Sequence, residues 1–254
     1  MVKELKNKGV NFDFNNHNNC ELILLAEIII VSPGVHLDLP ILAKAREKGI
    51  PVISEVELAY QILNKPMVAV TGTNGKTTTT TLIAEMINQS DKKAIAAGNI
   101  GLALVSVDDE HLDYVIAEVS SYQLETIREF KPWISIILNI QPDHLERHGD
   151  MENYISQKSR IFINQTIEDF LVYNLDDEQV VKMASSAKCR KIGFTKKNTE
   201  ILGLLPHEIR IPGEHNIENC LAAATAASLC GVKRETIAKV LKEFPGVEHR
   251  IELC

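Results

Sequence analysis

The segment from Val68 to Thr80 constrains the fold more than any other part of the chain. Small and β-branched residues at 68–71 lead into a turn that contains Gly72 and Gly75, and Lys76 with a run of threonines then opens a helical stretch. Strand, glycine turn, Lys-Thr and helix in this order are typical of a phosphate-binding loop. The two glycines let backbone N–H groups approach a polyphosphate, and the start of the helix adds the positive end of its dipole.

The string that begins at Gly72 is tighter than the common GxxxxGK[ST] pattern, because position 70 is valine. Lys76 is suited to the β- and γ-phosphates, and the hydroxyl of Thr77 is suited to Mg²⁺. An ordinary turn between a strand and a helix is the alternative interpretation. We predict a nucleotide-binding loop made of Gly72, Thr73, Asn74, Gly75, Lys76, Thr77 and Thr78.

Strand and helix patterns alternate along the rest of the chain. Apolar strand patterns occur at 67–71, 94–97, 114–119, 134–138 and 170–173, and helical patterns occur at 76–89, 121–130, 151–165 and 177–186. Short β pieces at 190–211 and helices at 216–230 and 234–244 follow. This alternation predicts an α/β fold with a mostly parallel sheet covered on both faces, in a P-loop ATPase-type central domain. Ligands of such sheets bind beyond the carboxyl ends of the strands.

Residues 1–65 predict a smaller, partial Rossmann-like α/β domain. A β-branched run ends at Val31, a helix covers 39–48, and a second strand covers 50–53. Ser54 and Glu57 have the spacing of a capping box at the start of the next helix. The asparagine-rich stretch at 15–19 is expected to be a polar loop.

Composition excludes several classes of protein. The 254 residues carry a net charge of −7 without a long basic run, which argues against a nucleic-acid partner. No apolar run is long enough for a membrane span, and the N-terminus lacks the apolar core of a signal peptide. The five cysteines, at 20, 189, 220, 230 and 254, never have CxxC spacing. We therefore expect reduced thiols in a cytoplasmic protein, with a monomer as the default state.

Three polar positions beyond the loop are candidates for metal chemistry. Glu118 ends a strand near the loop, where an acid commonly anchors Mg²⁺. His144 follows Asp143 just past another strand, and Lys158 lies on the polar face of a helix. Alternatively, Asp143 and His144 are polar residues of a solvated loop, and Lys158 is a surface charge. Spacing alone indicates an enzyme that uses ATP or GTP with Mg²⁺, and nothing finer.

A series of strings then resembles the Mur ligase family, from about Ile28 to the end of the chain. The strings follow the order of that family at 71–78, 98–101, 118–125, 138–145, 149–162, 213–216 and 249–250. The Ser-Ser-Tyr-Gln-Leu-Glu string at 120–125 is similar to that of the members that add D-glutamate. The resemblance implies an ATP-dependent amide ligase of peptidoglycan synthesis, with UDP-N-acetylmuramoyl-L-alanine and D-glutamate as substrates and an acyl phosphate between them.

The resemblance also implies residue roles. Thr77 and Glu118 would bind a first Mg²⁺, and His144 and Lys158 would serve a second, with Lys158 carried as a carbamate. A carbamate needs a neutral amine and hence a depressed pKa of the lysine. Further roles would fall to Asn216 at the adenine, Arg250 at the phosphates, Asn99 at the sugar-peptide substrate, and Ser32, Pro33 and Gly34 at the uridine nucleotide.

The chain also departs from the family, which has three domains. The usual opening Gly-rich turn is missing, since residues 1–20 contain one glycine, Gly9, and the chain stops four residues after Arg250. We therefore expect a partial UDP-sugar-binding domain at 1–65, the ATP-binding domain at 66–247, and only the start of a C-terminal domain at 248–254. The alternatives to the ligase are a catalytically incomplete ATP-binding fragment and another ligase of the Mur or folylpolyglutamate type.

Overall fold

The computed structural model describes residues 7–10, 23–197, 204 and 206–247. The chain divides into two compact units, Met1–Ile53 and Ser54–Cys254. The division thus falls just before the helix that starts at Glu55. The assignment of the three domains to their ligands stays a prediction.

The first unit contains a two-stranded sheet of β1 (Ile29–Val31) and β2, a strand that runs over Val52–Ser54. Helix α2 (Pro40–Glu47) begins at a proline, which suits the first helical position because its missing N–H would have no partner there. A short 3₁₀ turn, η1 (Ile23–Leu25), precedes β1. Val31, Ile41, Leu42, Ala45 and Val52 form the buried core of this unit. The asparagine-rich stretch at 15–19 lies outside the described residues.

The second unit is built on a six-stranded, fully parallel sheet with strand order β4-β5-β3-β6-β7-β8. The strands are β3 (Met67–Thr71), β4 (Ala94–Gly98), β5 (Tyr114–Glu118), β6 (Ile134–Ile137), β7 (Phe170–Asn174) and β8 (Arg190–Phe194). Buried β-branched and small residues dominate the central strands, as expected when both faces of a sheet are covered. The sequence-based α/β prediction is therefore confirmed.

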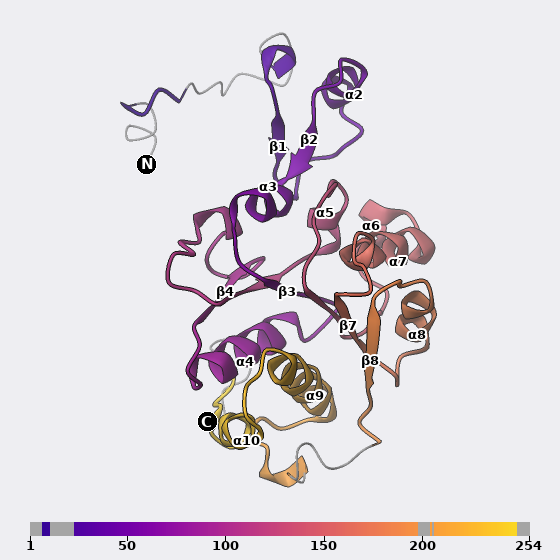
Figure 1. The fold of residues 1–254 in the computed structure, drawn as a ribbon. Coiled ribbons are helices and arrows are strands. Elements are labelled where there is room, and N and C mark those ends of the chain that lie inside the picture. Colours follow the sequence, from indigo (N-terminus) through magenta and orange to yellow (C-terminus); the bar gives the residue numbers. More distant parts are fainter. Residues whose placement is uncertain (1–6, 11–22, 198–203, 205, 248–254) are drawn as a thin grey trace. The chain divides into compact units, whose positions relative to one another are not determined.

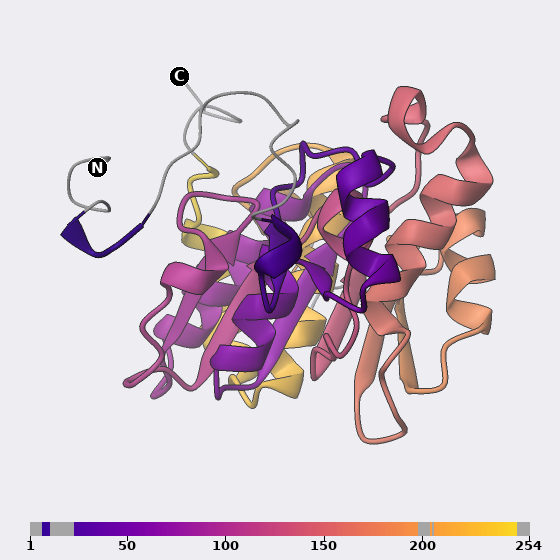
Figure 2. The same ribbon diagram turned by 90° about the horizontal axis from the view of Figure 1, so that it is seen from above.

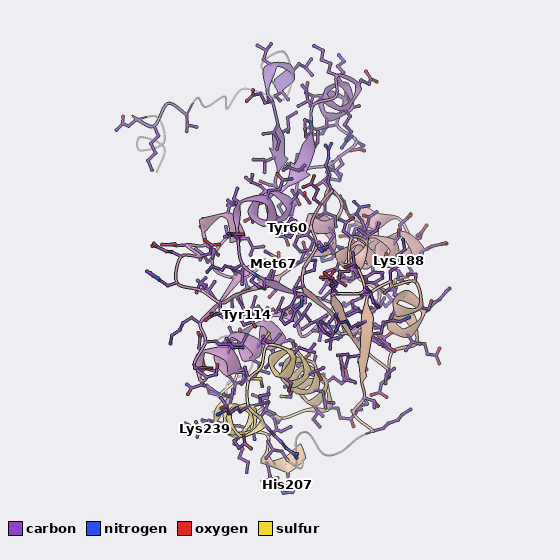
Figure 3. All side chains as sticks on the ribbon, viewed as in Figure 1. Tyr60, Met67, Tyr114, Lys188, His207 and Lys239 are labelled. Atoms are coloured by element: carbon purple, nitrogen blue, oxygen red, sulfur yellow. The ribbon has the colours of Figure 1, made fainter. Side chains whose placement is uncertain are left out.

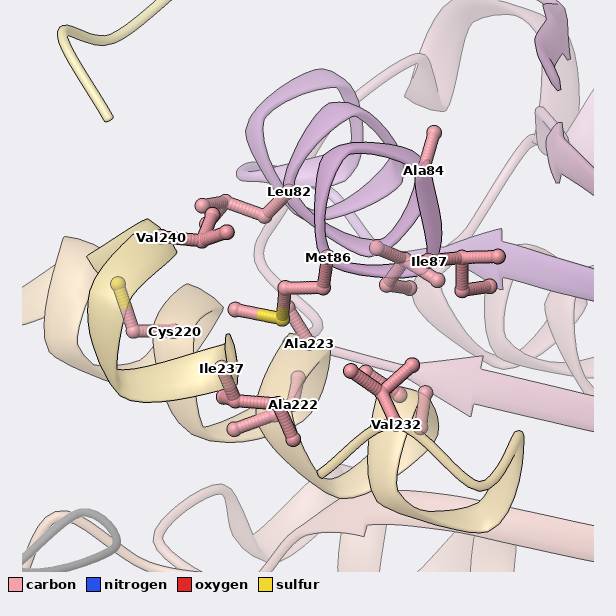
Figure 4. Packing of buried hydrophobic residues seen from close by; sticks show 14 of the residues in the cluster. Leu82, Ala84, Met86, Ile87, Cys220, Ala222, Ala223, Val232, Ile237 and Val240 are labelled. Atoms are coloured by element: carbon pink, nitrogen blue, oxygen red, sulfur yellow. The ribbon is translucent and has the colours of Figure 1, made fainter. Parts of the chain in front are cut away.

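Helices cover both faces of this sheet in the two views of Figures 1 and 2. One face carries α4 (Lys76–Asn88), α9 (Glu214–Leu229) and α10 (Arg234–Glu243). Leu82 and Met86 of α4 meet Ala222, Ala223 and Val240 there, and the small alanines let the helices lie close together (Figure 4). The predicted helices at 76–89, 216–230 and 234–244 are thus present: α4 and α10 each end one residue earlier, and α9 begins two residues earlier and ends one residue earlier.

The opposite face carries shorter elements. They are α3 (Glu55–Ile62), η2 (Leu104–Ser106), α5 (Ser121–Leu124), α6 (Leu145–His148), α7 (Met151–Ser159), η3 (Arg160–Phe162) and α8 (Glu178–Ser185). The helix that follows β3 lies on one face, whereas those that follow β5 and β6 lie on the other. Ligands bind where connections diverge in this way, beyond the carboxyl ends of neighbouring strands. The carboxyl ends of β3, β5 and β6 are therefore the place to look for a site.

The helix predicted at 121–130 is wrong in length. Helix α5 ends at Leu124 rather than near residue 130, because side chains replace the helical backbone bonds of this stretch. The buried Glu57 carboxylate accepts the N–H groups of residues 128–130 at 2.8 to 3.0 Å. The guanidinium of Arg160 donates to the carbonyls of Leu124 and Ile127 at 2.7 and 2.8 Å.

The predicted capping box at Ser54 is accordingly half formed. Ser54 Oγ accepts the N–H of Glu57 at 3.3 Å, but the Glu57 side chain bonds to 128–130 instead of reaching back. The helix predicted at 151–165 is α7 followed by η3, and the region expected to hold β pieces contains β8 and a 3₁₀ turn, η4 (Pro206–Glu208). Among the described residues, no helix is long and apolar enough to cross a lipid bilayer.

Candidate functional site

The glycine turn at the carboxyl end of β3 has the backbone of a ligand cradle. Gly75 is the N-cap of α4 and has φ of 84°, a left-handed backbone conformation in which a residue with a side chain would be strained. A Cβ atom added at Gly75 would lie 2.1 Å from Asn219 Oδ1, so the loop and α9 approach too closely for any other residue. No side chain caps this end of α4, which leaves its first N–H groups directed at the space above the loop.

Two carboxamide side chains from the neighbouring strand connection hold the turn. Asn139 Oδ1 accepts the N–H of Asn74 at 2.8 Å, and Asn139 Nδ2 donates to the Asn74 carbonyl at 3.1 Å. Asn74 Nδ2 in turn donates to Gln141 Oε1 at 3.0 Å. The hydroxyl of Thr73 lies 2.9 Å from the N–H of Gln141, which donates to it. The loop that follows β6 therefore fixes the shape of the loop that follows β3.

Two lysines converge on the turn. Lys76 Nζ donates to the carbonyls of Gly72 at 3.0 Å and Thr73 at 2.8 Å, and Lys158 Nζ donates to the same Gly72 carbonyl at 3.0 Å. Lys158 is only 2% exposed. Burial and, next, the charge of Lys76 lower the pKa of Lys158 to about 7, while Asp143 opposes the shift. Lys158 is thus a buried amine with a large neutral fraction at neutral pH, and not a surface charge.

Glu118 brings the predicted metal-binding side chains together at the end of β5. Its Oε2 accepts the Thr77 hydroxyl at 2.7 Å, and its Oε1 accepts Asn99 Nδ2 at 3.1 Å. The register pairs Glu118 with Val70 of β3, which brings the carboxylate to the first turn of α4. A Cβ at Gly98 would lie 2.4 Å from the Glu118 carbonyl, so this glycine lets β4 approach β5 closely.

His144 lies at the start of α6 in a left-handed conformation with φ of 54°, and is the one non-glycine residue with positive φ among those described. This strain is uncommon and concentrates at functional sites. Its imidazole nitrogens lie 3.4 Å from Asp143 and 3.7 Å from Glu146, and its ring lies 5.0 Å from that of Tyr122. Among the described contacts, His144 reaches Lys158 only through the rings of Tyr122, His148 and Tyr154, and not by a direct bond.

A pocket of about 560 Å³ opens beside the loop, toward the N-terminus of α9. Its volume lies within the range of small-molecule sites. Asn216 and Asn219 are both buried in its wall, and Asn219 Nδ2 donates to Asn216 Oδ1 at 3.3 Å. The pocket is lined by Asn74, Gly75, Thr78, Asn139, Gln141, His215, Asn216, Glu218 and Asn219. Amide groups that surround a volume of this size next to a phosphate cradle are suited to the edge of a nucleobase.

The remaining predicted site residues lie elsewhere. Ser32, Pro33 and Gly34 belong to the first unit, directly after β1. Arg250 lies outside the described residues.

Several site residues were missed by the sequence reasoning. Asn219 follows Asn216 by three residues and so shares its helix face, which was an available signal. Asn139 and Gln141 follow a strand, as site residues of this fold do. Tyr154, fully buried, lies four residues before Lys158 on α7, and no signal in the sequence distinguishes it from a core residue.

A larger cavity of about 910 Å³ opens at the opposite end of the strands from the glycine turn. Tyr60, Met67 and Tyr114 are among its lining residues and are labelled in Figure 3. Because Met67 and Tyr114 are the first residues of β3 and β5, this cavity lies at the amino ends of the strands, away from the loop.

The donor set at the loop favours a hard cation held together with phosphate oxygens. No group of three or more His, Cys, Asp or Glu side chains is placed to chelate a metal among the described residues. Mg²⁺ needs only one or two carboxylates when a phosphate supplies further oxygens, and the Thr77–Glu118 pair meets that requirement. All cysteines within the described part of the chain, Cys189, Cys220 and Cys230, are buried and free.

Comparison with known proteins places this chain in a family. A model of the Mur ligase middle domain matches residues 70–204, more than half of the chain. UDP-N-acetylmuramoylalanine–D-glutamate ligase from Thermoanaerobacter sp. (strain X514) is 43% identical over 274 positions, which cover 99% of this chain and 60% of that protein. The ligase of the same name from Natranaerobius thermophilus is 44% identical over 94% of this chain and 58% of its own length. The chain thus spans about 60% of the length of these relatives.

Solved structures share the fold. UDP-N-acetylmuramate:L-alanyl-gamma-D-glutamyl-meso-diaminopimelate ligase from Neisseria meningitides matches with a TM-score of 0.69 at 17% identity, over 98% of this chain and 88% of that one. UDP-N-acetylmuramate-alanine ligase from Thermotoga maritima matches with a TM-score of 0.59 at 26% identity, over 90% of this chain and 57% of that one.

Proposed function

The chain belongs to the Mur ligase family, and we propose that it carries the ATP-binding and phosphoryl-transfer machinery of a ligase that joins D-glutamate to UDP-N-acetylmuramoyl-L-alanine. The observation that carries the proposal is the junction at the carboxyl ends of β3 and β5, where the Thr77–Glu118 pair lies beside the glycine turn and two lysines. The identity of more than 40% to ligases of that name supports the choice of substrates.

ATP would bind with its phosphates on the turn at 72–78 and its base in the pocket next to α9. The helix start and Lys76 supply positive charge for the phosphates. Asn216 and Asn219 offer amide donors and acceptors for the base edge. Arg250 is assigned to the phosphates from the family resemblance alone.

Thr77 and Glu118 would hold one Mg²⁺, and His144 and Lys158 would serve a second. Bound Mg²⁺ would neutralise phosphate charge and so allow an anionic carboxylate to approach. A Lys158 ammonium cannot ligate a cation, whereas its carbamate can. The depressed pKa of Lys158 supports this role, because only the neutral amine adds CO₂.

In the proposed reaction, a carboxylate oxygen of UDP-N-acetylmuramoyl-L-alanine attacks the γ-phosphorus of ATP and ADP leaves. The amine of D-glutamate then attacks the acyl phosphate carbonyl, and phosphate leaves with the oxygen that the carboxylate supplied. Asn99 would contact the sugar-peptide substrate near Glu118, and Ser32, Pro33 and Gly34 would contact the uridine nucleotide. The enzyme contributes position and charge rather than covalent chemistry.

The test is phosphate release by the chain with ATP, Mg²⁺, UDP-N-acetylmuramoyl-L-alanine and D-glutamate, with L-glutamate as the matched control. The proposal predicts release that needs both substrates and that falls at least about a hundredfold in Lys76→Met, since a phosphate-contacting charge is lost. ATP binding without substrate-dependent release would instead identify a nucleotide-binding module. Unchanged ATP affinity in Lys76→Met would contradict the loop assignment.

A further inference from the structure

His148 lies in the interior next to the proposed site, and neither the family strings nor the proposed chemistry assigns it a role. It ends α6 and is 8% exposed. Its Nε2 lies 3.0 Å from Ser121 Oγ, and its Nδ1 lies 3.8 Å from Glu125 Oε1. The Nε2 contact is within hydrogen-bond distance, whereas the Glu125 carboxylate lies beyond it.

The protonation state of His148 follows from its surroundings. Burial lowers the pKa of His148, and the charges of Lys158, Arg147 and His144 act in the same direction, whereas Glu125 opposes them. The neutral ring can accept the Ser121 hydroxyl at Nε2 and direct its Nδ1–H toward Glu125. The other oxygen of Glu125, Oε2, accepts Arg147 Nη2 at 2.9 Å, which fixes the carboxylate.

The His148 ring is the middle member of a stack. It lies 5.4 Å from the Tyr122 ring at an interplanar angle of 19°, and 5.3 Å from the Tyr154 ring at 48°. Tyr122 also contacts the ring of His144. The stack therefore runs from His144 at the start of α6 to Tyr154 on α7, and its rings come from two connections, β5 to β6 and β6 to β7.

Tyr154, the last ring of this stack, contacts two residues of the proposed site. The Tyr154 hydroxyl lies 3.1 Å from Thr73 Oγ1 of the glycine turn, and Lys158 Nζ lies 4.7 Å above the Tyr154 ring. Thr73 is also held by Asn139 and Gln141, so the turn does not depend on Tyr154 alone. Lys158 Nζ has the Gly72 carbonyl and the face of Tyr154 as its described contacts. A shift of the Tyr154 ring would therefore change one of the two described contacts that hold the Lys158 amine.

We propose that His148 is a positioning residue whose flat ring, hydrogen-bonded to Ser121, sets the place of Tyr154 and through it the place of Lys158. This inference rests on the proposed nucleotide site, in which Lys158 must be held beside the turn. Polarity at His148 anchors the ring, but the planar ring itself does the positioning.

The matched variants are His148→Phe and His148→Leu, each combined with Ser121→Ala. Removing both polar partners together avoids leaving a buried hydroxyl unpaired. The two double variants then have similar apolar volume and differ in whether a ring faces Tyr154. Circular dichroism and the thermal midpoint establish that both are folded.

The measurement is the acetylation of Lys158 by trace acetic anhydride, read by peptide mass spectrometry relative to the exposed Lys188. The leucine variant is expected to raise this ratio at least about threefold, as loss of an aromatic contact of ordinary strength would, while the phenylalanine variant keeps the wild-type ratio. Equal ratios in the two folded variants would overturn the proposal, as would a raised ratio in both. A purely structural role would change the thermal midpoint without separating the two.

If the leucine variant does not fold, His148→Gln is compared with His148→Phe combined with Ser121→Ala, because glutamine keeps a polar group near Ser121 but has no ring. A raised ratio for glutamine alone supports the proposal, and equal ratios overturn it. No nucleotide is added in these experiments. Equal acetylation ratios would therefore not contradict the proposed ATP site. In the same way, a failure of ATP binding would not change the interpretation of the acetylation ratios.

Discussion

Lys76 and Lys158 donate hydrogen bonds to one shared acceptor, the carbonyl oxygen of Gly72, each across 3.0 Å. One lysine precedes the other by 82 positions in the chain, yet both amines meet at the first glycine of the turn. Two like charges close together are tolerated when one amine gives up its proton readily, and the lowered pKa of Lys158 has this property. The predictions below start from this arrangement.

Replacement of Lys158 by methionine is expected to stabilise the protein, and most strongly at low pH. The folded-state pKa of Lys158 is about 7, whereas that of an unfolded lysine is about 10.4. Between these values the unfolded chain binds more protons, so the free energy of unfolding of the wild type rises with pH and the advantage of Lys158→Met shrinks. We expect the difference to fall by about 2 kcal/mol between pH 7 and pH 9, measured by urea unfolding. Parallel pH profiles for the two proteins would show that Lys158 titrates normally.

Gly75→Ala is expected to weaken both the loop and ATP binding. The added Cβ would meet Asn219 Oδ1 at 2.1 Å in a left-handed backbone, and we expect a loss of about 2–4 kcal/mol in the free energy of unfolding. Gly101→Ala is the matched control, since Gly101 has φ of 55° and open space around it, and only the backbone cost of about 1–2 kcal/mol applies. Thermal unfolding and ATP titration of both variants, and of Gly75→Ala with Asn219→Ala, separate the clash from the backbone strain. Equal losses in the two alanine variants would contradict the close approach of α9.

Glu57→Gln is expected to destabilise the second unit without touching the site. The carboxylate accepts three N–H groups, at Arg128, Glu129 and Phe130, and an amide keeps only one acceptor oxygen. We expect a loss of about 2–4 kcal/mol in urea unfolding. Glu55→Gln is the control, because Glu55 accepts a single N–H from Val105 and should cost about 1 kcal/mol. Similar costs for the two variants would argue against this role of Glu57.

Thr77→Val is expected to weaken the dependence of ATP affinity on Mg²⁺. The hydroxyl bonded to Glu118 is the oxygen that would reach the ion, so the gain in affinity on adding Mg²⁺ should drop about tenfold, with Mg²⁺-free affinity nearly unchanged. Thr81→Val provides the control, since its hydroxyl bonds to the Thr77 carbonyl within α4. Calorimetric titration with and without Mg²⁺ checks both variants. An unaltered Mg²⁺ effect in Thr77→Val would exclude this residue as a ligand.

The sequence predicted the parallel α/β sheet and the glycine turn, because both follow from local patterns such as the strand at 67–71 and the Gly-Lys-Thr step at 75–77. It placed Thr77 and Glu118 at one site because a carboxyl end of a strand and a helix start meet there by topology. It could not predict that Glu57 and Arg160 would replace the helix at 125–130, since these partners are distant in the chain. The burial of Lys158 and the stack around His148 likewise depend on three-dimensional packing that periodicity does not encode.

The most direct test of carboxylate activation is the transfer of ¹⁸O from the labelled alanyl carboxylate of UDP-N-acetylmuramoyl-L-alanine into phosphate, with ATP, Mg²⁺ and D-glutamate present. Because the carboxylate oxygen that attacks the γ-phosphorus leaves with the phosphate, the account predicts one ¹⁸O atom in each phosphate released, read by mass spectrometry. Phosphate released without ¹⁸O, or no release that depends on the substrate, would contradict it.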